Sequence, residues 1–212
     1  MKKILVLVLA GILTFSVAAI AGLTGTPHQL GTEICVACHT PHAAIAGYGP
    51  LWNRNDSGGT YTLYTSATFT GTNAANALGG QSLACMTCHN GLASTIVNGP
   101  GTDAGTTAPY NLAAGQVNGF ANVGQDLTND HPVGFTYSAG TTDPDGGDVW
   151  PAVVAGKINN VYPIYSGQME CATCHDVHNS ASYAGQGSTQ VYFLRATNVN
   201  SAMCTTCHTN KL

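Results

Sequence analysis

The chain repeats one pentapeptide, Cys-x-x-Cys-His, four times, and these copies contain all eight of its cysteines. The cysteine pairs are Cys35 and Cys38, Cys85 and Cys88, Cys171 and Cys174, and Cys204 and Cys207. The histidines that complete the motifs are His39, His89, His175 and His208. Residues three and four positions apart share one side of a helical turn, so the two thiols and the imidazole face the same way. This spacing is the attachment signature of c-type haem, with two thioether bonds and a histidine on the iron. The sequence therefore predicts four covalently attached haems c.

Paired cysteines have two other common uses. Two Cys-x-x-Cys pairs form the four-thiolate zinc site, and an even number of cysteines in an exported chain forms a disulfide scaffold. Neither alternative explains why a histidine follows the second cysteine in every copy. We therefore interpret the four motifs as haem attachment sites.

The histidines outside the motifs also number four, which matches the number of predicted irons. They are His28, His42, His131 and His178. His42 and His178 each lie three residues after a motif histidine, on the proximal side of their own haem, so we expect each to ligate a neighbouring haem. A single histidine of this kind is equally well an exposed or hydrogen-bonded side chain. The matched count favours axial ligation by all four.

Two axial imidazoles per iron have consequences for function. Methionine is the competing ligand, but Met86, Met169 and Met203 lie inside or just before a motif, and we interpret them as packing residues. Iron with two imidazoles has a lower reduction potential than iron with histidine and methionine. It also has no open position for a substrate, so we expect an electron-transfer protein and not an enzyme. A haem-dependent oxyanion reductase is the enzymatic alternative.

The elements that must position these motifs are expected to be short. Charged residues make up only 8% of the chain, and large aliphatic side chains are too scarce for an ordinary core. We expect the fold class of a multihaem cytochrome c, with stacked haems as the core, mostly irregular backbone, short helices at the motifs and few strands. Aromatic residues and threonines predict one strand at 61–70. Turn-rich sequence predicts loops that wrap haems between the second and third motifs.

The N-terminus predicts export. Residues 1–21 combine a lysine pair, an apolar run and the small-x-small sequence Ala19-Ile20-Ala21, which together are typical of a cleaved secretory signal peptide. An uncleaved membrane anchor is the alternative. We expect residues 22–212 to form a single tetrahaem domain that is secreted, extracellular or at the cell surface, with the periplasm as the alternative location.

The charge of the processed chain limits its partners. Loss of Lys2 and Lys3 leaves four Lys or Arg against ten Asp or Glu, a net charge of −6. No basic patch is present for nucleic acid, whereas a basic redox protein or a metal cation as electron acceptor would be attracted. The acidic segment 143–148 is a candidate calcium loop without the distal glutamate of an EF-hand, and an acidic surface turn is the alternative.

Several segments resemble tetrahaem c-type cytochromes of the OmcE-like family, which polymerise into extracellular nanowires. The similar segments are Cys35-x-x-Cys38-His39-Thr40-Pro41-His42, Pro27-His28 and Asp130-His131-Pro132-Val133. The resemblance covers the motifs and their flanks but not the loops. It implies a continuous stack of bis-histidine haems along a filament, in which one iron takes a histidine from the neighbouring subunit. His28, on a short N-terminal arm, is our candidate for this trans ligand. A monomeric periplasmic electron shuttle is the alternative.

Overall fold

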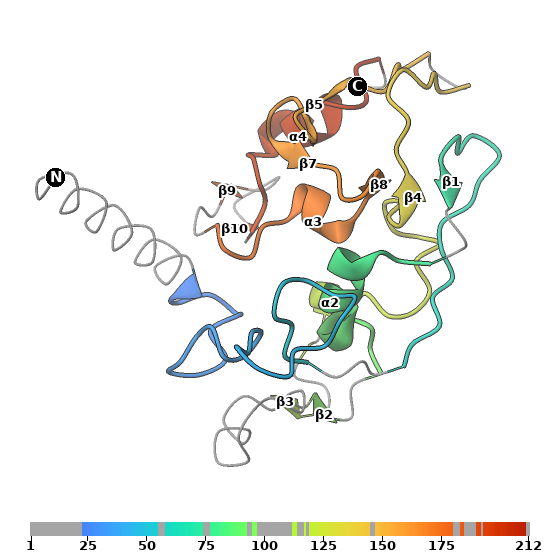
Figure 1. Ribbon diagram of the computed structural model, residues 1–212. Helices are drawn as coiled ribbons and strands as arrows, with labels where there is room; N and C mark the ends of the chain where they lie inside the picture. The colour runs from blue at the N-terminus through green and yellow to red at the C-terminus, as the bar shows by residue number, and fades with distance from the viewer. Residues whose placement is uncertain are drawn as a thin grey trace, which may run out of the picture.

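The computed structural model in Figure 1 describes most of the chain from Leu23 to Asn210. The described residues are 23–54, 58–73, 77–92, 95–96, 112–113, 117, 119–144, 147–179, 183–184, 190–191 and 193–210. The predicted signal peptide, residues 1–21, lies outside these ranges. All eight cysteines and all eight histidines lie within them.

The helices are short, and three of them carry a motif. They are α2 (Gly80–His89), α3 (Cys171–Cys174) and α4 (Ala202–Thr205), with the 3₁₀ turns η3 (Gly119–Ala121) and η4 (Val199–Ser201). The second motif forms the C-terminal end of α2, and α3 runs from the first to the second cysteine of the third motif. The fourth motif begins within α4. Figure 1 shows these three helices one after another along the molecule. Among the residues that the structure describes, no helix has the length and apolar character needed to cross a membrane.

Every strand in the described ranges is two residues long. The strands are β1 (Thr72–Asn73), β2 (Thr95–Ile96), β3 (Leu112–Ala113), β4 (Phe135–Thr136), β5 (Val153–Val154), β6 (Lys157–Ile158), β7 (Tyr162–Pro163), β8 (Gln168–Met169), β9 (Tyr183–Ala184) and β10 (Gln190–Val191). They form antiparallel sheets in the orders β1-β4-β8 and β5-β6-β7, and the pairs β2-β3 and β9-β10. In the register of the first sheet, Phe135 lies opposite Asn73 on one side and Met169 on the other. Such short ladders supply few hydrogen bonds and are not stable alone.

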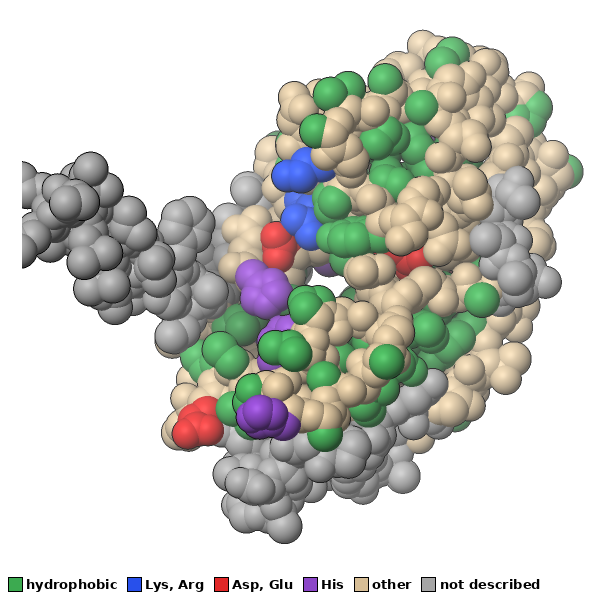
Figure 2. Space-filling view, in the orientation of Figure 1, with side chains coloured by type: hydrophobic (Ala, Val, Ile, Leu, Met, Phe, Trp, Pro, Cys, Tyr) green, Lys and Arg blue, Asp and Glu red, His purple; other side chains and the backbone are tan. Residues whose placement is uncertain are grey.

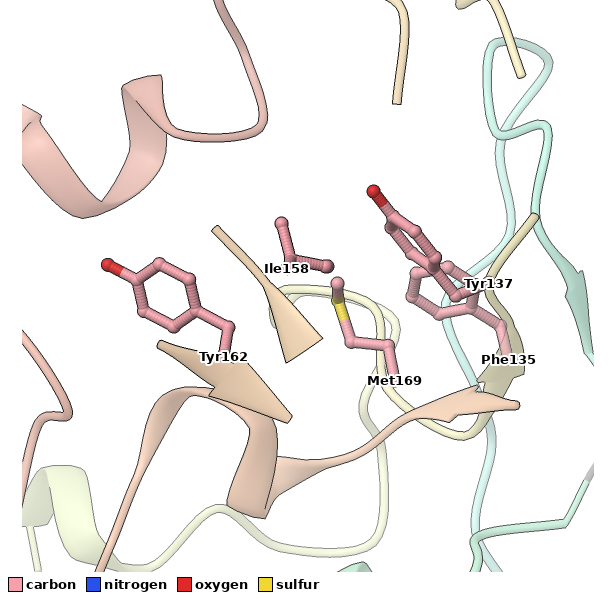
Figure 3. Packing of buried hydrophobic residues seen from close by; sticks show 5 residues of the cluster. All are labelled: Phe135, Tyr137, Ile158, Tyr162 and Met169. Carbon is pink, nitrogen blue, oxygen red and sulfur yellow. The ribbon is translucent and has the colours of Figure 1, made fainter. Parts of the chain in front are cut away.

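Two small apolar clusters lie among these elements. The larger cluster consists of Phe135, Tyr137, Ile158, Tyr162 and Met169, in which Ile158 and Met169 lie between Tyr162 and the other two rings (Figure 3). The second cluster consists of Leu63, Leu78, Met86 and Leu127. Each cluster is far smaller than the core of a typical domain of this length.

The segment 61–70 does not form the predicted strand. Thr62 makes a single parallel bridge with Asp126, through hydrogen bonds to the backbone of Gln125 and Leu127 at 3.0 and 2.8 Å. The chain then turns, and Phe69 donates to the carbonyl of Ser66 at 3.3 Å. The prediction was wrong because strand propensity reflects pairing and packing. In this segment only Thr62 forms a β-bridge with another described residue.

A polar cluster joins α2 to α3 and therefore the second motif to the third. The buried Ser82 of α2 donates a hydrogen bond to the carboxylate of Glu170 and accepts one from the backbone N–H of Cys171 at 2.9 Å. Glu170 also forms a capping box with Thr173 at the start of α3. Gly79 makes room for this arrangement, because a Cβ there would overlap the Glu170 carboxylate.

The close approach at Gly80 leads to a stability prediction. A Cβ on Gly80 would overlap the backbone oxygen of Gly47, so Gly80→Ala is expected to lower the free energy of unfolding by roughly 1–3 kcal/mol, as overpacking typically does. The measurement is denaturant unfolding of the haem-loaded protein. Gly49→Ala is the matched control, because a Cβ there meets nothing within 4 Å. Equal effects of the two changes would contradict the packing at Gly80.

Candidate functional site

All four motifs form the same local turn. His39, His175 and His208 each donate a backbone hydrogen bond to the carbonyl of the first cysteine of their own motif, at 2.9, 3.1 and 2.9 Å. The second motif has the same helical conformation, because α2 ends at His89. The first motif forms this turn without being part of a longer helix. The turn places both thiols and the imidazole on one side of the backbone.

The thiols of successive motifs are neighbours in space. Removal from water raises the pKa of Cys38 to about 11. Arg54 lowers this pKa, and the nearby thiol of Cys88 in the second motif raises it. The thiols of Cys85 in the second motif and Cys171 in the third interact closely, which raises the pKa of Cys85 and lowers that of Cys171. The first three motifs are therefore adjacent in the order of the sequence.

The third and fourth motifs are adjacent in the same way. Removal from water raises the pKa of Cys174 to about 11, and the nearby thiol of Cys207 raises it further. All eight cysteines are free, and within the described ranges no three of their sulfur atoms come close enough to share one metal ion. The described thiols are therefore not placed as a four-thiolate zinc site requires.

Three histidines from outside the motifs each lie opposite a motif histidine. The ring centroids are 6.0 Å apart for His28 and His89, 6.1 Å for His39 and His178, and 6.5 Å for His131 and His208. The ring planes of the second pair are 19° apart, and those of the other two are 62° and 66° apart. Figure 2 shows histidine side chains gathered beside a hollow in this face of the molecule. Each pair brings together two segments that are distant in sequence.

These separations suit two imidazoles on opposite sides of one metal ion. A metal–imidazole bond is about 2 Å long and the ring centroid lies about 1 Å behind the nitrogen, so two such ligands have centroids roughly 6 Å apart. Ordinary aromatic pairs also have centroids about 4.5–7 Å apart, so the distance alone is not specific. The composition of the pairs is specific, because each joins one motif histidine to one histidine from outside the motifs. The residues present therefore fit haems with two axial histidines.

The backbone orients two of the motif rings for ligation. His39 donates from Nδ1 to the carbonyl oxygen of Pro50 at 2.7 Å, and His89 donates from Nδ1 to that of Ala121 at 2.5 Å. These bonds fix the tautomer that leaves Nε2 as the free ligand atom. Burial and the neighbouring His89 lower the pKa of His28 to about 4, so its ring is neutral at neutral pH, as ligation requires.

His42 and His175 are the two histidines without a facing imidazole. Both side chains are exposed, and neither takes part in a ring contact with another described residue. Thr40 accepts from the backbone N–H of His42 at 3.4 Å and donates to its carbonyl at 2.9 Å, so the turn after the first motif is fixed. The structure brings together three of the four expected ligand pairs, and the remaining two histidines stay apart.

Arg54 is a buried cation that the sequence did not single out. Its side chain is 1% exposed, Nε donates to the carbonyl of Ala37, and both terminal nitrogens are buried without a partner in the described part of the chain. Burial lowers its pKa, although the nearby Cys88 and Cys38 thiols oppose this shift. A buried guanidinium without an anion is costly. A haem propionate would supply the missing anion at the junction of the first two motifs.

The acidic segment 143–148 lies against the fourth motif. Asp143 and Asp148 are buried, whereas Asp145 and Gly146 lie outside the described residues. Ligand atoms of Asp143, Asp148 and His208 lie within 4.8 Å of one another. Calcium takes oxygen ligands, and the third atom here is a ring nitrogen. Calcium binding stays a prediction, and the observed feature is a buried carboxylate beside a motif histidine.

Comparison with known proteins does not assign the chain to a family. No protein-family model matches it, and no curated protein matches it either. The haem interpretation therefore depends on the four motifs and on the histidine pairs around them.

Proposed function

We propose that the protein is an exported tetrahaem c-type cytochrome that transfers electrons through closely spaced bis-histidine haems. We further propose that it polymerises into a conductive filament outside the cell. The observation that carries the proposal is the position of His28, His131 and His178 opposite three different motif histidines.

The residues of the chain would attach and ligate the haems. The proposed sets are Cys35, Cys38, His39 and His178 for the first haem, Cys85, Cys88, His89 and His28 for the second, Cys171, Cys174 and His175 for the third, and Cys204, Cys207, His208 and His131 for the fourth. Arg54 would pair with a propionate near the first two motifs. Each haem, when bound, supplies one reversible one-electron couple.

Electron transfer suits this ligand set better than catalysis does. Two histidines on each iron would leave no open position for a substrate and would keep the reduction potential low, once a second histidine from a neighbouring subunit completes the third site. The adjacency of the first motif to the second, the second to the third and the third to the fourth supports a relay along the chain.

The geometry favours a different trans ligand from the one that the resemblance led us to expect. His28 faces His89 of its own chain, which supports a role within the subunit. His42 and His175 are both exposed and both lack a facing imidazole among the described residues. We therefore propose that His42 of one subunit completes the third haem of the next. The acceptors of the filament would be other redox proteins or extracellular cations, which the negative charge attracts.

A haem count and spin state test the electron-transfer proposal. Mass spectrometry of the exported protein is expected to find four covalently bound haems, and the assembled form is expected to be low-spin in both oxidation states. A persistent five-coordinate, high-spin iron in the assembled form would instead favour the oxyanion reductase. A haem-free chain would remove the proposal altogether.

The histidine pairs predict which haem each substitution affects. His178→Ala is expected to convert one of the four haems, the one held by His39, to the high-spin form, because it removes the opposing imidazole. His28→Ala is expected to do the same for the haem held by His89. Electron paramagnetic resonance of the ferric protein measures the change. The pairing is wrong if either variant keeps every haem low-spin.

The trans assignment predicts that His42 is needed for assembly. His42→Ala is expected to abolish filaments in negative-stain images and to leave a monomer with three low-spin haems. Pro41→Ala is the adjacent control and is expected to keep assembly, because it leaves the imidazole in place. Filaments of His42→Ala with four low-spin haems would disprove the assignment. A wild-type protein that stays monomeric at all concentrations would favour the periplasmic shuttle.

A further inference from the structure

The fourth motif differs from the first two in what its histidine faces. Nδ1 of His208 lies 3.7 Å from Oδ2 of Asp148, whose side chain is 0% exposed. Neither of these two atoms is hydrogen-bonded to any other described residue. They form a complementary pair, because a neutral imidazole that ligates through Nε2 carries its proton on Nδ1. At 3.7 Å the two atoms are in ion-pair contact, and a small shift of the ring would bring them to hydrogen-bond distance.

The chain holds this carboxylate in place with its other oxygen. Oδ1 of Asp148 accepts from the hydroxyl of Thr209 at 3.2 Å and from the backbone N–H of Asn210 at 2.6 Å. Asp143 donates from its backbone N–H to the carbonyl of Asp148 at 2.8 Å, which closes the loop. These bonds tie the loop to the residues directly after His208. Asp148 is thus fixed on the side of the ring away from the ligating nitrogen.

The rings of the first two motifs have neutral acceptors. Nδ1 of His39 and Nδ1 of His89 donate to the backbone carbonyls of Pro50 and Ala121. The nearest comparable carboxylate, Asp176, lies 3.6 Å from His178, but it is more exposed and its charge is shared with Arg195 at 2.9 Å. Within the described residues, the only ion-pair partner of Asp148 is His208. Glu170, directly before the third motif, is buried as well, but it binds Ser82 of α2 and faces no motif histidine. Within the described residues, Asp148 is therefore the buried carboxylate that faces a motif imidazole.

We propose that Asp148 is a positioning residue for His208 and that it makes the fourth haem harder to reduce than it would be with a neutral acceptor. This inference rests on the proposed function, since it needs a haem on His208. A hydrogen bond from Nδ1 to a carboxylate fixes the ring and increases the basicity of the ligating nitrogen. A more basic ligand and a nearby negative charge both stabilise ferric over ferrous iron. The couple is a single-electron one, in which the electron enters or leaves along the relay and the proton stays on Nδ1.

The test compares Asp148→Asn with the wild type in a spectroelectrochemical titration of the haem-loaded protein. The change keeps an oxygen for Thr209 and Asn210 but removes the charge. One of the four midpoint potentials is expected to rise by about 59 mV, which corresponds to about tenfold in the one-electron equilibrium constant. Asp126→Asn is the control. Its exposed carboxylate bonds only to Thr128 among the described residues, so this change is expected to leave all four potentials unchanged.

A second measurement keeps the inference testable if Asp148→Asn does not fold or loses a haem. In the reduced wild-type protein, the Nδ1 proton of His208 is expected to resonate further downfield than those of His39 and His89, because charge-assisted hydrogen bonds are stronger. Unchanged potentials in a folded four-haem variant, or equal proton shifts in the wild type, would overturn the inference and leave the proposed function intact. A chain without haem would instead refute the proposed function.

Discussion

The opposition of two imidazoles across about 6 Å is the constraint on which the rest of the structure depends. The paired rings come from segments far apart in sequence, as in His28 with His89 and His131 with His208. Direct contact between two rings at this distance stabilises a pair by only about 1 kcal/mol. An ion ligated by both rings would turn each pair into a firm connection between those segments. Each pair would then be both a redox site and a cross-link of the fold.

This constraint explains how so little secondary structure holds a long chain. Every described strand has two residues, and the two apolar clusters consist of five and four buried side chains. Neither the ladders nor the clusters are large enough to offset the conformational entropy of ordering so many loop residues. Ligation of haem iron by the paired histidines would add free energy to the folded state alone, so metal binding and folding would be coupled. Small residues near the motifs then allow a close approach, as Gly79 does beside Glu170.

The local turns of the motifs could be predicted from the sequence, whereas the partners of their histidines could not. The motifs are local patterns, so the turn from each first cysteine to its histidine followed directly from their spacing. The partner of a given motif histidine depends on loop paths, and nothing near His178 indicates that it faces His39. Arg54 could not be singled out from the sequence, and the segment of Asp148 was interpreted only as a candidate calcium loop, because the roles of both depend on burial. The strand predicted at 61–70 failed for the same reason, since pairing beyond Thr62 depends on residues elsewhere in the chain.

Burial of the few charged residues gives the motifs different electrostatic surroundings. Arg54 places an unpaired cation beside Cys38 and Cys88, and Asp148 places an anion behind His208. In a low-dielectric interior such charges act strongly on nearby sites, whereas exposed charges are screened. A positive charge favours the reduced state of a neighbouring iron and a negative charge favours the oxidised state. With haems bound, electrons would therefore be drawn from the fourth motif toward the first two, so the order of the motifs would give the relay a direction that identical bis-histidine sites would lack.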